Sequence, residues 1–179
     1  MSDSEFRFWE SIGEDFRANK GNPKGLFIVL SYRITSFFSR KRRNLLLFPI
    51  SFPIRVFYKL LVEWILGTEI PASTRIGKGL KIHHGMGLVV NPRARIGNHV
   101  TLKHNTTIGA KTDLNDRVLA APTIEDSVIV HPHSIIIGDI VIGQGAIIGA
   151  GSVIINSVPP RSIAAGNPGR VIKSLEEAG

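Results

Sequence analysis

The sequence predicts a mainly β protein, a parallel β-helix preceded by a helical cap, and three observations support this prediction. Aliphatic residues recur every six positions between Ile70 and Ile154. Glycine is concentrated in the same region, because fifteen of the 18 glycines lie from residue 67 onward. The first 66 residues instead carry apolar side chains at helical spacing. A chain of 179 residues is enough for one compact unit of this kind.

The composition excludes several classes of protein. The chain has no cysteine, so disulfide scaffolds, cysteine-ligated zinc sites and thiol nucleophiles are excluded. Its first ten residues are polar and acidic, which does not predict a secretory signal peptide. The most apolar stretch, residues 44–66, is interrupted by proline and charged residues and does not predict a transmembrane helix. We therefore expect a cytoplasmic protein.

The six-residue repeat is the strongest signal in the sequence. A helix would place apolar residues three and four positions apart, whereas a period of six fits short strands joined by tight corners. Three such strands make one coil of about 18 residues, and stacked coils bury a continuous interior. Glycine often follows the aliphatic residue, and we expect it to relieve the corner by adopting a positive φ. The repeat positions are Ile70, Ile76, Ile82, Val90, Ile96, Leu102, Ile108, Ile124, Val130, Ile136, Ile142, Ile148 and Ile154.

Two interruptions break the repeat. A two-residue insertion follows Ile82 and coincides with His83-His84-Gly85, where a bulge would let a side chain leave the coil wall. The second interruption, Lys111 to Pro122, is too long for a corner. It predicts a loop, residues 110–122, that protrudes from the coil.

The first 66 residues predict a helical cap that covers one end of the solenoid. Helices are expected over Ser11–Asn19, Gly25–Ser39 and Ile54–Leu66, with Pro53 at or near the start of the third. This region holds 11 basic and 6 acidic residues, and the net charge of the whole chain is +8. We favour the interpretation that these basic residues belong to a helical cap with a solvated basic loop. The alternative is a basic amphipathic surface in peripheral contact with anionic lipid, at the inner face of the membrane. No motif indicates nucleic-acid binding.

His84 and Glu69 form the candidate catalytic pair. Neutral histidine is well suited to take a proton from a hydroxyl near pH 7, and it needs a partner on its other ring nitrogen. Glu69 precedes His84 by 15 residues, close to one coil, so the two can lie near each other in space.

The segments Glu69–Gly87, Thr107-Ile-Gly109, Ile148–Ser152 and Val158–Arg170 carry a resemblance to a known family. They resemble the hexapeptide-repeat acetyltransferases, within the serine acetyltransferase-like superfamily, and most of all the colanic acid biosynthesis branch. The resemblance implies a left-handed β-helix and a homotrimer with active sites between subunits. It also implies acetyl-CoA as co-substrate, with no metal required. We expect residues 1–66 to form the cap, 67–160 the β-helix and 161–179 a tail that contacts the CoA groove.

The resemblance assigns roles position by position. His84 falls on the family's catalytic base and Glu69 on the acid that pairs with it, where serine acetyltransferases have Asp. Three small residues fall on the groove for the pantetheine arm, and two basic residues fall near the nucleotide end. These cofactor-binding positions are Ala110, Pro132, Ala150, Arg170 and Lys173.

Departures from the serine enzymes favour a sugar acceptor. Their Asp directly before the catalytic His is His83 here, and a second recognition Asp is replaced by Asn22. An ammonium substrate without carboxylate partners is costly to bind, whereas a sugar hydroxyl needs only hydrogen bonds and a base. His83, His104 and Asn105 are therefore the predicted acceptor-binding residues.

Three alternatives remain beside sugar O-acetylation. One is serine O-acetylation in cysteine biosynthesis. A second is a metal-dependent hydratase in which His99 and His104 join a histidine from a neighbouring subunit. The third is a scaffold without catalytic activity.

Overall fold

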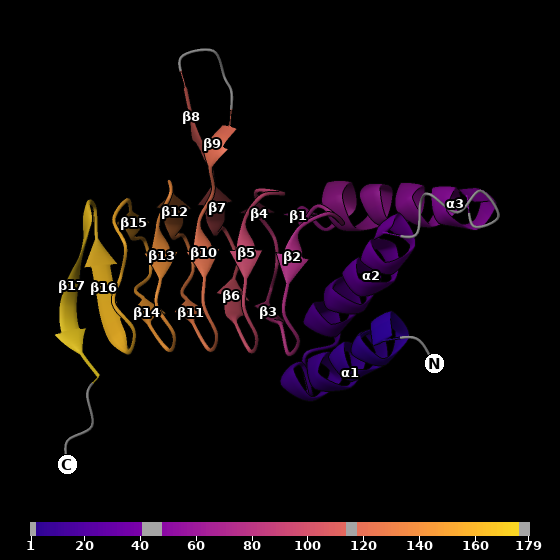
Figure 1. The fold of residues 1–179 in the computed structure, drawn as a ribbon, viewed down its shortest axis with the longest axis horizontal. Helices are drawn as coiled ribbons and strands as arrows, with labels where there is room; N and C mark the ends of the chain where they lie inside the picture. Colours follow the sequence, from indigo (N-terminus) through magenta and orange to yellow (C-terminus); the bar gives the residue numbers. More distant parts are fainter. Residues whose placement is uncertain (1–2, 41–47, 114–117, 176–179) are drawn as a thin grey trace.

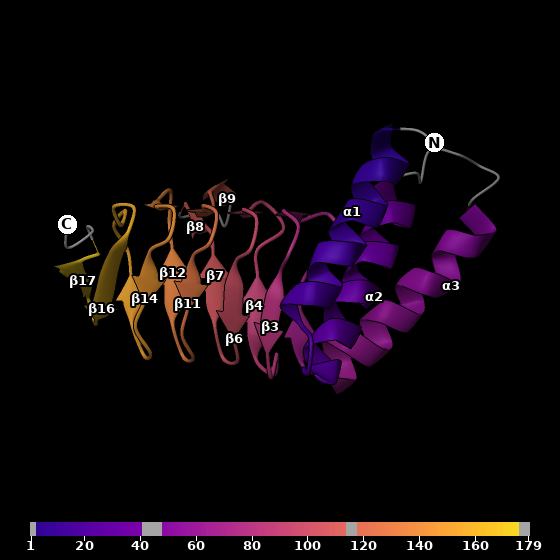
Figure 2. The ribbon, with the colours of Figure 1, turned by 90° about the horizontal axis from the view of Figure 1, so that it is seen from below.

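The computed structural model describes residues 3–40, 48–113 and 118–175. Residues 41–43 of the basic run and residues 114–117 of the predicted loop lie outside these ranges. The described chain is a parallel β-helix with helices stacked against its N-terminal end (Figure 1). Viewed from below, the helices all lie at one end of the solenoid axis and the C-terminal hairpin lies at the other (Figure 2).

The cap consists of α1 (Asp3–Ala18), α2 (Pro23–Arg40), α3 (Phe48–Tyr58) and the π-helical segment η2 (Lys59–Ile65). The first helix begins earlier than the capping pattern predicts. The third begins at Phe48, so Pro53 lies inside it and not at its start. Pro53 cannot donate the i→i−4 hydrogen bond, yet the helix continues through it.

Three parallel sheets form the walls of the solenoid. Sheet A contains β1 (Thr68–Glu69), β4 (Leu88–Val90), β7 (Thr107–Gly109), β12 (Ile135–Ile137) and β15 (Val153–Ile154). Sheet B contains β2 (Arg75–Ile76), β5 (Arg95–Ile96), β10 (Thr123–Ile124) and β13 (Val141–Ile142). Sheet C contains β3 (Lys81–His83), β6 (Thr101–Lys103), β11 (Ile129–Val130), β14 (Ile147–Ile148), β16 (Ser162–Gly166) and the antiparallel edge strand β17 (Gly169–Ser174).

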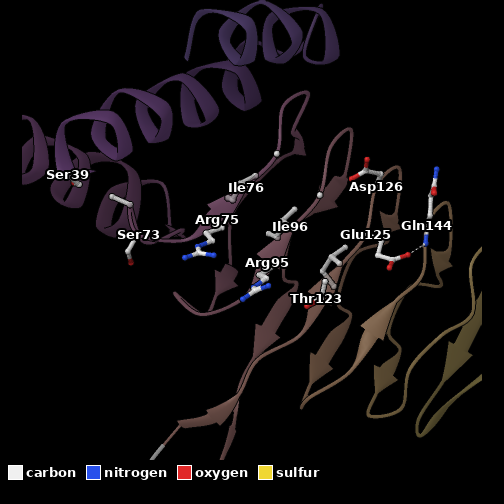
Figure 3. Close-up of a pocket in the computed structure, with 14 residues that line it drawn as sticks. Ser39, Ser73, Arg75, Ile76, Arg95, Ile96, Thr123, Glu125, Asp126 and Gln144 are labelled. Carbon is white, nitrogen blue, oxygen red and sulfur yellow. Dashed lines mark hydrogen bonds between the residues drawn. The ribbon is translucent and has the colours of Figure 1, made fainter. Parts of the chain in front are cut away.

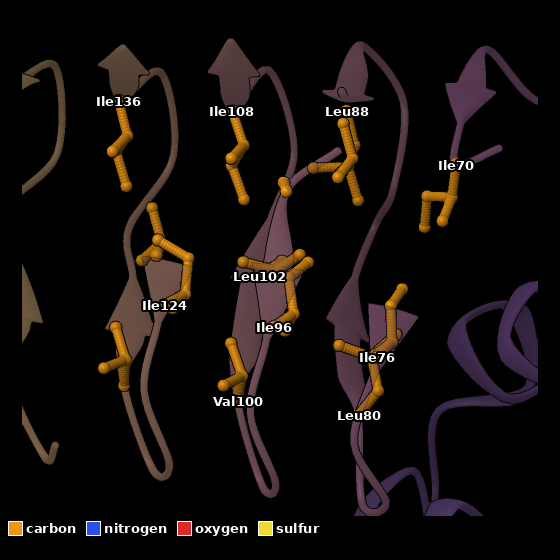
Figure 4. Packing of buried hydrophobic residues seen from close by; sticks show 14 of the residues in the cluster. Ile70, Ile76, Leu80, Leu88, Ile96, Val100, Leu102, Ile108, Ile124 and Ile136 are labelled. Carbon is orange, nitrogen blue, oxygen red and sulfur yellow. The ribbon is translucent and has the colours of Figure 1, made fainter. Parts of the chain in front are cut away.

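The hexad prediction is confirmed at all thirteen positions. Each predicted aliphatic residue is buried, and none is more than 9% exposed. They pair in register from coil to coil, as Ile76 does with Ile96 and Ile82 with Leu102. Their side chains point into one shared interior (Figure 4). Because each coil buries its aliphatic residues only against its neighbours, stacking stabilises the fold.

The glycines that follow the aliphatic residues do not have the predicted conformation. None of the glycines Gly77, Gly97 and Gly143 has a positive φ. The positive φ values occur later in the corner, at Gly79, His99, Ser127, Gly145 and Arg161. A Cβ on Gly97 would instead lie 2.7 Å from the Asp126 backbone nitrogen on the next coil. Glycine is needed there because adjacent coils approach closely, and the φ > 0 position tolerates other residues.

Polar side chains of the cap replace a missing coil. The first coil has an open backbone edge, and unpaired strand edges must be covered. Asn19 accepts from the Ile82 N–H (3.3 Å) and donates to the Leu80 carbonyl (2.8 Å). Two tyrosine hydroxyls donate to carbonyls of the same coil, Tyr32 to Thr74 and Tyr58 to Ile70.

A buried ion pair completes this edge. Arg33 and Asp15 are 2.7 Å apart, with side chains 8% and 0% exposed. Asp15 also accepts a hydrogen bond from the Leu80 N–H (2.9 Å), and Arg33 donates to the Ile76 carbonyl (2.8 Å). The cap is therefore joined to the strand that leads into His83 and His84.

The described residues of the second interruption project from the coil (Figure 1). It forms an antiparallel hairpin of β8 (Lys111–Thr112) and β9 (Val118–Ala120) that stands away from the solenoid (Figure 1). The chain returns to the wall at Pro122 and β10.

Candidate active site

Five of the six histidines, all except His99, lie at or next to the turn from a strand of sheet C into the next strand of sheet A, which we call the C–A corner. Successive C–A corners are joined by backbone hydrogen bonds, from the Asn105 N–H to the Met86 carbonyl (2.8 Å) and from the His133 N–H to the His104 carbonyl (3.2 Å). These corners therefore form one continuous edge along the solenoid. The edge begins at the two-residue insertion that contains His84.

A row of imidazoles lines this edge. The ring of His84 lies 5.6 Å from that of His104, which lies 5.3 Å from that of His133, and both contacts are edge-to-face. His83 lies 6.5 Å from His84. His84 has a φ of 68°, so the bulge turns it out of the strand and leaves its side chain exposed. The predicted residues His83, His84 and His104 are thus brought together.

His104 and Asn105 complete the row. The Nδ1 atom of His104 is buried and has no hydrogen-bond partner in the described part of the chain. The Asn105 amide nitrogen lies 3.5 Å from the Nε2 atom of His133. His133 was not among the predicted site residues, because its sequence neighbourhood, His131-Pro132, is typical of a simple corner. The signal that identifies it is its register with Asn105 on the preceding coil, since Thr101 and Leu102 pair with Ile129 and Val130 and both corner residues have a positive φ.

The outer face of sheet C adds positive charge beside the row. His83 pairs in register with Lys103, whose Nζ atom lies 3.2 Å from the Nδ1 atom of His131. Burial, followed by the charges of Lys81 and Lys103, lowers the pKa of His83. Burial and Lys103 likewise lower the pKa of His131. Both imidazoles are therefore held in the neutral form near pH 7.

Glu69 lies beside the His84 corner without bonding to it. The buried Thr68 hydroxyl donates a hydrogen bond to the Gly85 carbonyl (2.9 Å). Glu69 follows Thr68 and His84 precedes Gly85, so Glu69 and His84 lie on adjacent segments. Both side chains are exposed, and no hydrogen bond joins them within the described ranges. Catalytic hydrogen bonds often tighten only when substrate is present.

The predicted cofactor-binding residues lie at two places. Pro132 and Ala150 occupy C–A corners of consecutive coils, joined by the hydrogen bond from the Gly151 N–H to the Pro132 carbonyl (2.9 Å). Arg170 is opposite Ala165 at the same end of sheet C. Ala110 follows β7 at the other end of sheet A, beside the protruding hairpin, and Lys173 pairs with Ile163 farther along β17.

The C–A edge is long. Five strand spacings separate β3 from β17 in sheet C. At about 4.8 Å each, they span about 24 Å. An extended ligand can therefore reach from the histidine row past Pro132 and Ala150 to Arg170 on one chain.

Two further predicted positions have structural explanations. Asn22 donates to the Ile82 carbonyl (2.6 Å) and accepts from the Gly25 N–H (3.1 Å), so its amide joins α2 to the solenoid. His99 lies at the corner between sheets B and C, at the opposite end of β6 from His104. The two histidines do not converge within one chain, and no cluster of three metal-ligating side chains occurs among the residues described.

A recess of about 1030 Å³ lies elsewhere, on the outer face of sheet B (Figure 3). Arg75 and Arg95 pair in register there, and Glu125 and Asp126 lie across from them. Glu125 accepts from the Gln144 N–H (2.8 Å), and hydrogen bonds from Asn98 lower the pKa of Asp126. None of the predicted site residues lines this recess.

Together, the hexad solenoid and the histidine-lined edge define a transferase of the hexapeptide-repeat class. Residues 121–156 match the bacterial transferase hexapeptide family (six repeats). The chain is 36% identical over 159 residues to WcaB of Escherichia coli K12, whose name assigns it to colanic acid biosynthesis as an acetyltransferase, covering 88% of this chain and 96% of WcaB. The chain belongs to the hexapeptide-repeat acetyltransferases, as the resemblance predicts.

Serine acetyltransferases are also similar to the chain in sequence and fold. The Bacillus licheniformis enzyme is 34% identical over 148 residues, which cover 83% of this chain and 64% of that enzyme. The chain therefore spans less than two thirds of that relative. The soybean serine acetyltransferase apoenzyme superposes with a TM-score of 0.78 at 30% identity, covering 94% of this chain and 70% of the soybean chain.

Proposed function

We propose that the protein transfers an acetyl group from acetyl-CoA to a sugar hydroxyl in the synthesis of a surface polysaccharide. The histidine row on the C–A edge is the observation that supports this function. His84 takes the hydroxyl proton as the oxygen attacks the thioester carbonyl. The carbon–sulfur bond then breaks, the sulfur takes up a proton and leaves as CoA, and the acetyl ester remains on the sugar. A base positioned in this way raises the reaction rate by roughly 10²–10⁴-fold.

Glu69 orients His84 in this proposal. The Thr68–Gly85 hydrogen bond holds together the two segments that carry the carboxylate and the imidazole. The CoA arm follows Pro132 and Ala150 along the edge toward Arg170, whose charge suits the CoA phosphates. Ala110 and the β8–β9 hairpin line the groove from a neighbouring copy in a homotrimer, with Lys173 near the nucleotide end.

The charges beside the row favour a sugar over serine. Lys81 and Lys103 flank His83 on the outer face of sheet C, and an ammonium group placed there would meet positive charge. Asn22, at the position of a serine-recognition carboxylate, is already hydrogen-bonded to the backbone. His83, His104 and Asn105 can instead donate to and accept from sugar hydroxyls.

Serine O-acetylation is the second candidate, because serine acetyltransferases match the chain in sequence and fold. CoA release should be measured with acetyl-CoA and, separately, serine and a panel of free, nucleotide-linked and lipid-linked sugars. We expect a larger kcat/KM for a sugar. A larger kcat/KM for serine than for every sugar would overturn the sugar proposal.

The role of His84 is tested with His84→Ala, using His99→Ala at a different corner as the control. We expect His84→Ala to lower kcat by roughly 10²–10⁴-fold while acetyl-CoA binding and the circular dichroism spectrum are unchanged. His99→Ala should keep the wild-type rate. Full activity in His84→Ala would show that another group is the base.

A further inference from the structure

The helix formed by α3 and η2 is apolar on both of its faces. Its inner face packs on the first coil through Tyr58 and Val62, which are 3% and 0% exposed. Its outer face is also apolar, and a helix that is apolar all round is normally buried. We call this outer face the apolar ridge. It consists of Phe52, Val56, Phe57, Leu60, Trp64 and Ile65, which are 40–70% exposed.

The sequence around the ridge is strongly basic. From Phe16 to Val62 the chain has ten basic residues and no acidic one. Arg55 and Lys59 lie on the ridge helix itself and are exposed. Glu63 is the single acidic residue in α3 and η2, and burial raises the pKa of its carboxyl, with Lys59 opposing and Glu69 adding to that shift.

These charges decide between two occupants of the ridge. A second copy of the chain would bring a cap of the same sign against this one, with repulsion between the two basic surfaces. An anionic lipid surface offers opposite charge, and each basic residue near it contributes favourably. Exposed aromatic and aliphatic side chains mixed with Lys and Arg are typical of helices that lie in a membrane interface. Within the described ranges no helix could cross a membrane.

We propose that the apolar ridge docks the protein on an anionic phospholipid surface. The aromatic side chains enter the headgroup region, and Arg55 and Lys59 contact lipid phosphates. The ridge ends at Ile65, and the nearby Gly67 carbonyl accepts a hydrogen bond from Gly87 in the His84 corner (2.7 Å). Docking therefore brings the first C–A corner, which contains His84, close to the lipid surface. If the proposed function holds, the acceptor is a sugar carried on a membrane lipid.

The two tryptophans provide an internal comparison. Trp64 lies on the ridge and Trp9 lies on α1, and they are 70% and 60% exposed. Trp9→Phe leaves Trp64 as the single reporter, and Trp64→Phe leaves Trp9. With vesicles of phosphatidylglycerol and phosphatidylethanolamine, we expect the Trp64 emission to shift to shorter wavelength and become protected from acrylamide. The Trp9 emission should stay unchanged, and phosphatidylcholine vesicles should have little effect on either.

Charge variants test the second half of the proposal. Arg55→Gln and Lys59→Gln should each weaken binding to the anionic vesicles by roughly fivefold. Added salt should weaken wild-type binding in the same direction. None of these measurements requires an acceptor or catalysis, so their failure is distinct from failure of the proposed reaction.

Two results would overturn the docking proposal. One is an unchanged Trp64 emission, or an equal response from Trp9, in the presence of anionic vesicles. The other is wild-type protein that ignores vesicles but whose oligomer dissociates in sedimentation when Trp64→Ser is introduced. That outcome would make the ridge an interface between copies.

Discussion

Replacing Asp15 by alanine should strongly destabilise the junction between the cap and the solenoid. The carboxylate contacts Arg33 through two hydrogen bonds (2.7 and 3.2 Å) and accepts a third from the Leu80 N–H. Removing one partner of a buried ion pair costs about 3–5 kcal/mol, and an orphaned backbone N–H costs about 1–3 kcal/mol. Arg33 keeps its bond to the Ile76 carbonyl, which reduces the penalty. We expect a loss of about 4 kcal/mol in the free energy of unfolding.

Urea unfolding followed by tryptophan fluorescence measures this loss, because both tryptophans, Trp9 and Trp64, lie in the cap. Protein concentration is held constant because oligomerisation contributes to apparent stability. The matched control is Glu14→Ala, which removes only a surface pair with the exposed Arg17. Such a pair contributes about 0–1 kcal/mol.

A double variant separates the cost of leaving the Arg33 charge buried and unpaired from the cost of losing side-chain packing. Asp15→Ala with Arg33→Met removes the unpaired charge, and it should regain part of the lost stability. If Asp15→Ala costs no more than Glu14→Ala, the buried pair does not hold the cap on the first coil, and our account of that edge is wrong.

Two further predictions concern the coils and the histidines. Gly97→Ala should lower stability by about 1–3 kcal/mol, because its Cβ meets the backbone of the next coil. Gly13→Ala has open space in α1 and should instead raise it by roughly 0.5–1 kcal/mol, so equal urea midpoints would contradict the close-approach explanation. The lowered pKa of His83 means that the native state binds protons less readily than the unfolded state. The free energy of unfolding should therefore be highest above the ordinary histidine pKa and should decrease as the pH falls below that value. His83→Gln should flatten this slope in urea midpoints measured from about pH 8 to about pH 5, and an unchanged slope would refute the assignment.

The solenoid could be predicted from the sequence because its repeat acts locally. Each aliphatic residue, such as Ile96 or Ile142, is required at a fixed phase whatever the rest of the chain does. Burial of apolar side chains in short strands then determines the coil. The same reasoning predicts a protruding loop, since residues 110–122 break the phase.

The candidate site was only partly predictable. His83, His84 and His104 could be named from the insertion and the family resemblance. His133 could not, because nothing in its own neighbourhood distinguishes it from a corner residue. Its place in the row depends on the register between coils, which brings residues 29 positions apart, His104 and His133, into ring contact.

The sequence alone determined the period, the buried aliphatic positions and the location of the histidine bulge, because these depend on short-range spacing. Only the tertiary structure decided why glycine follows the aliphatic residue, how Asp15 and Arg33 close the first coil, and that Trp64 lies on an exposed apolar face. Each of these depends on which surfaces meet across distant segments. A one-dimensional pattern shows which side chains are apolar or charged, and the packing of coils and helices decides which of them are covered.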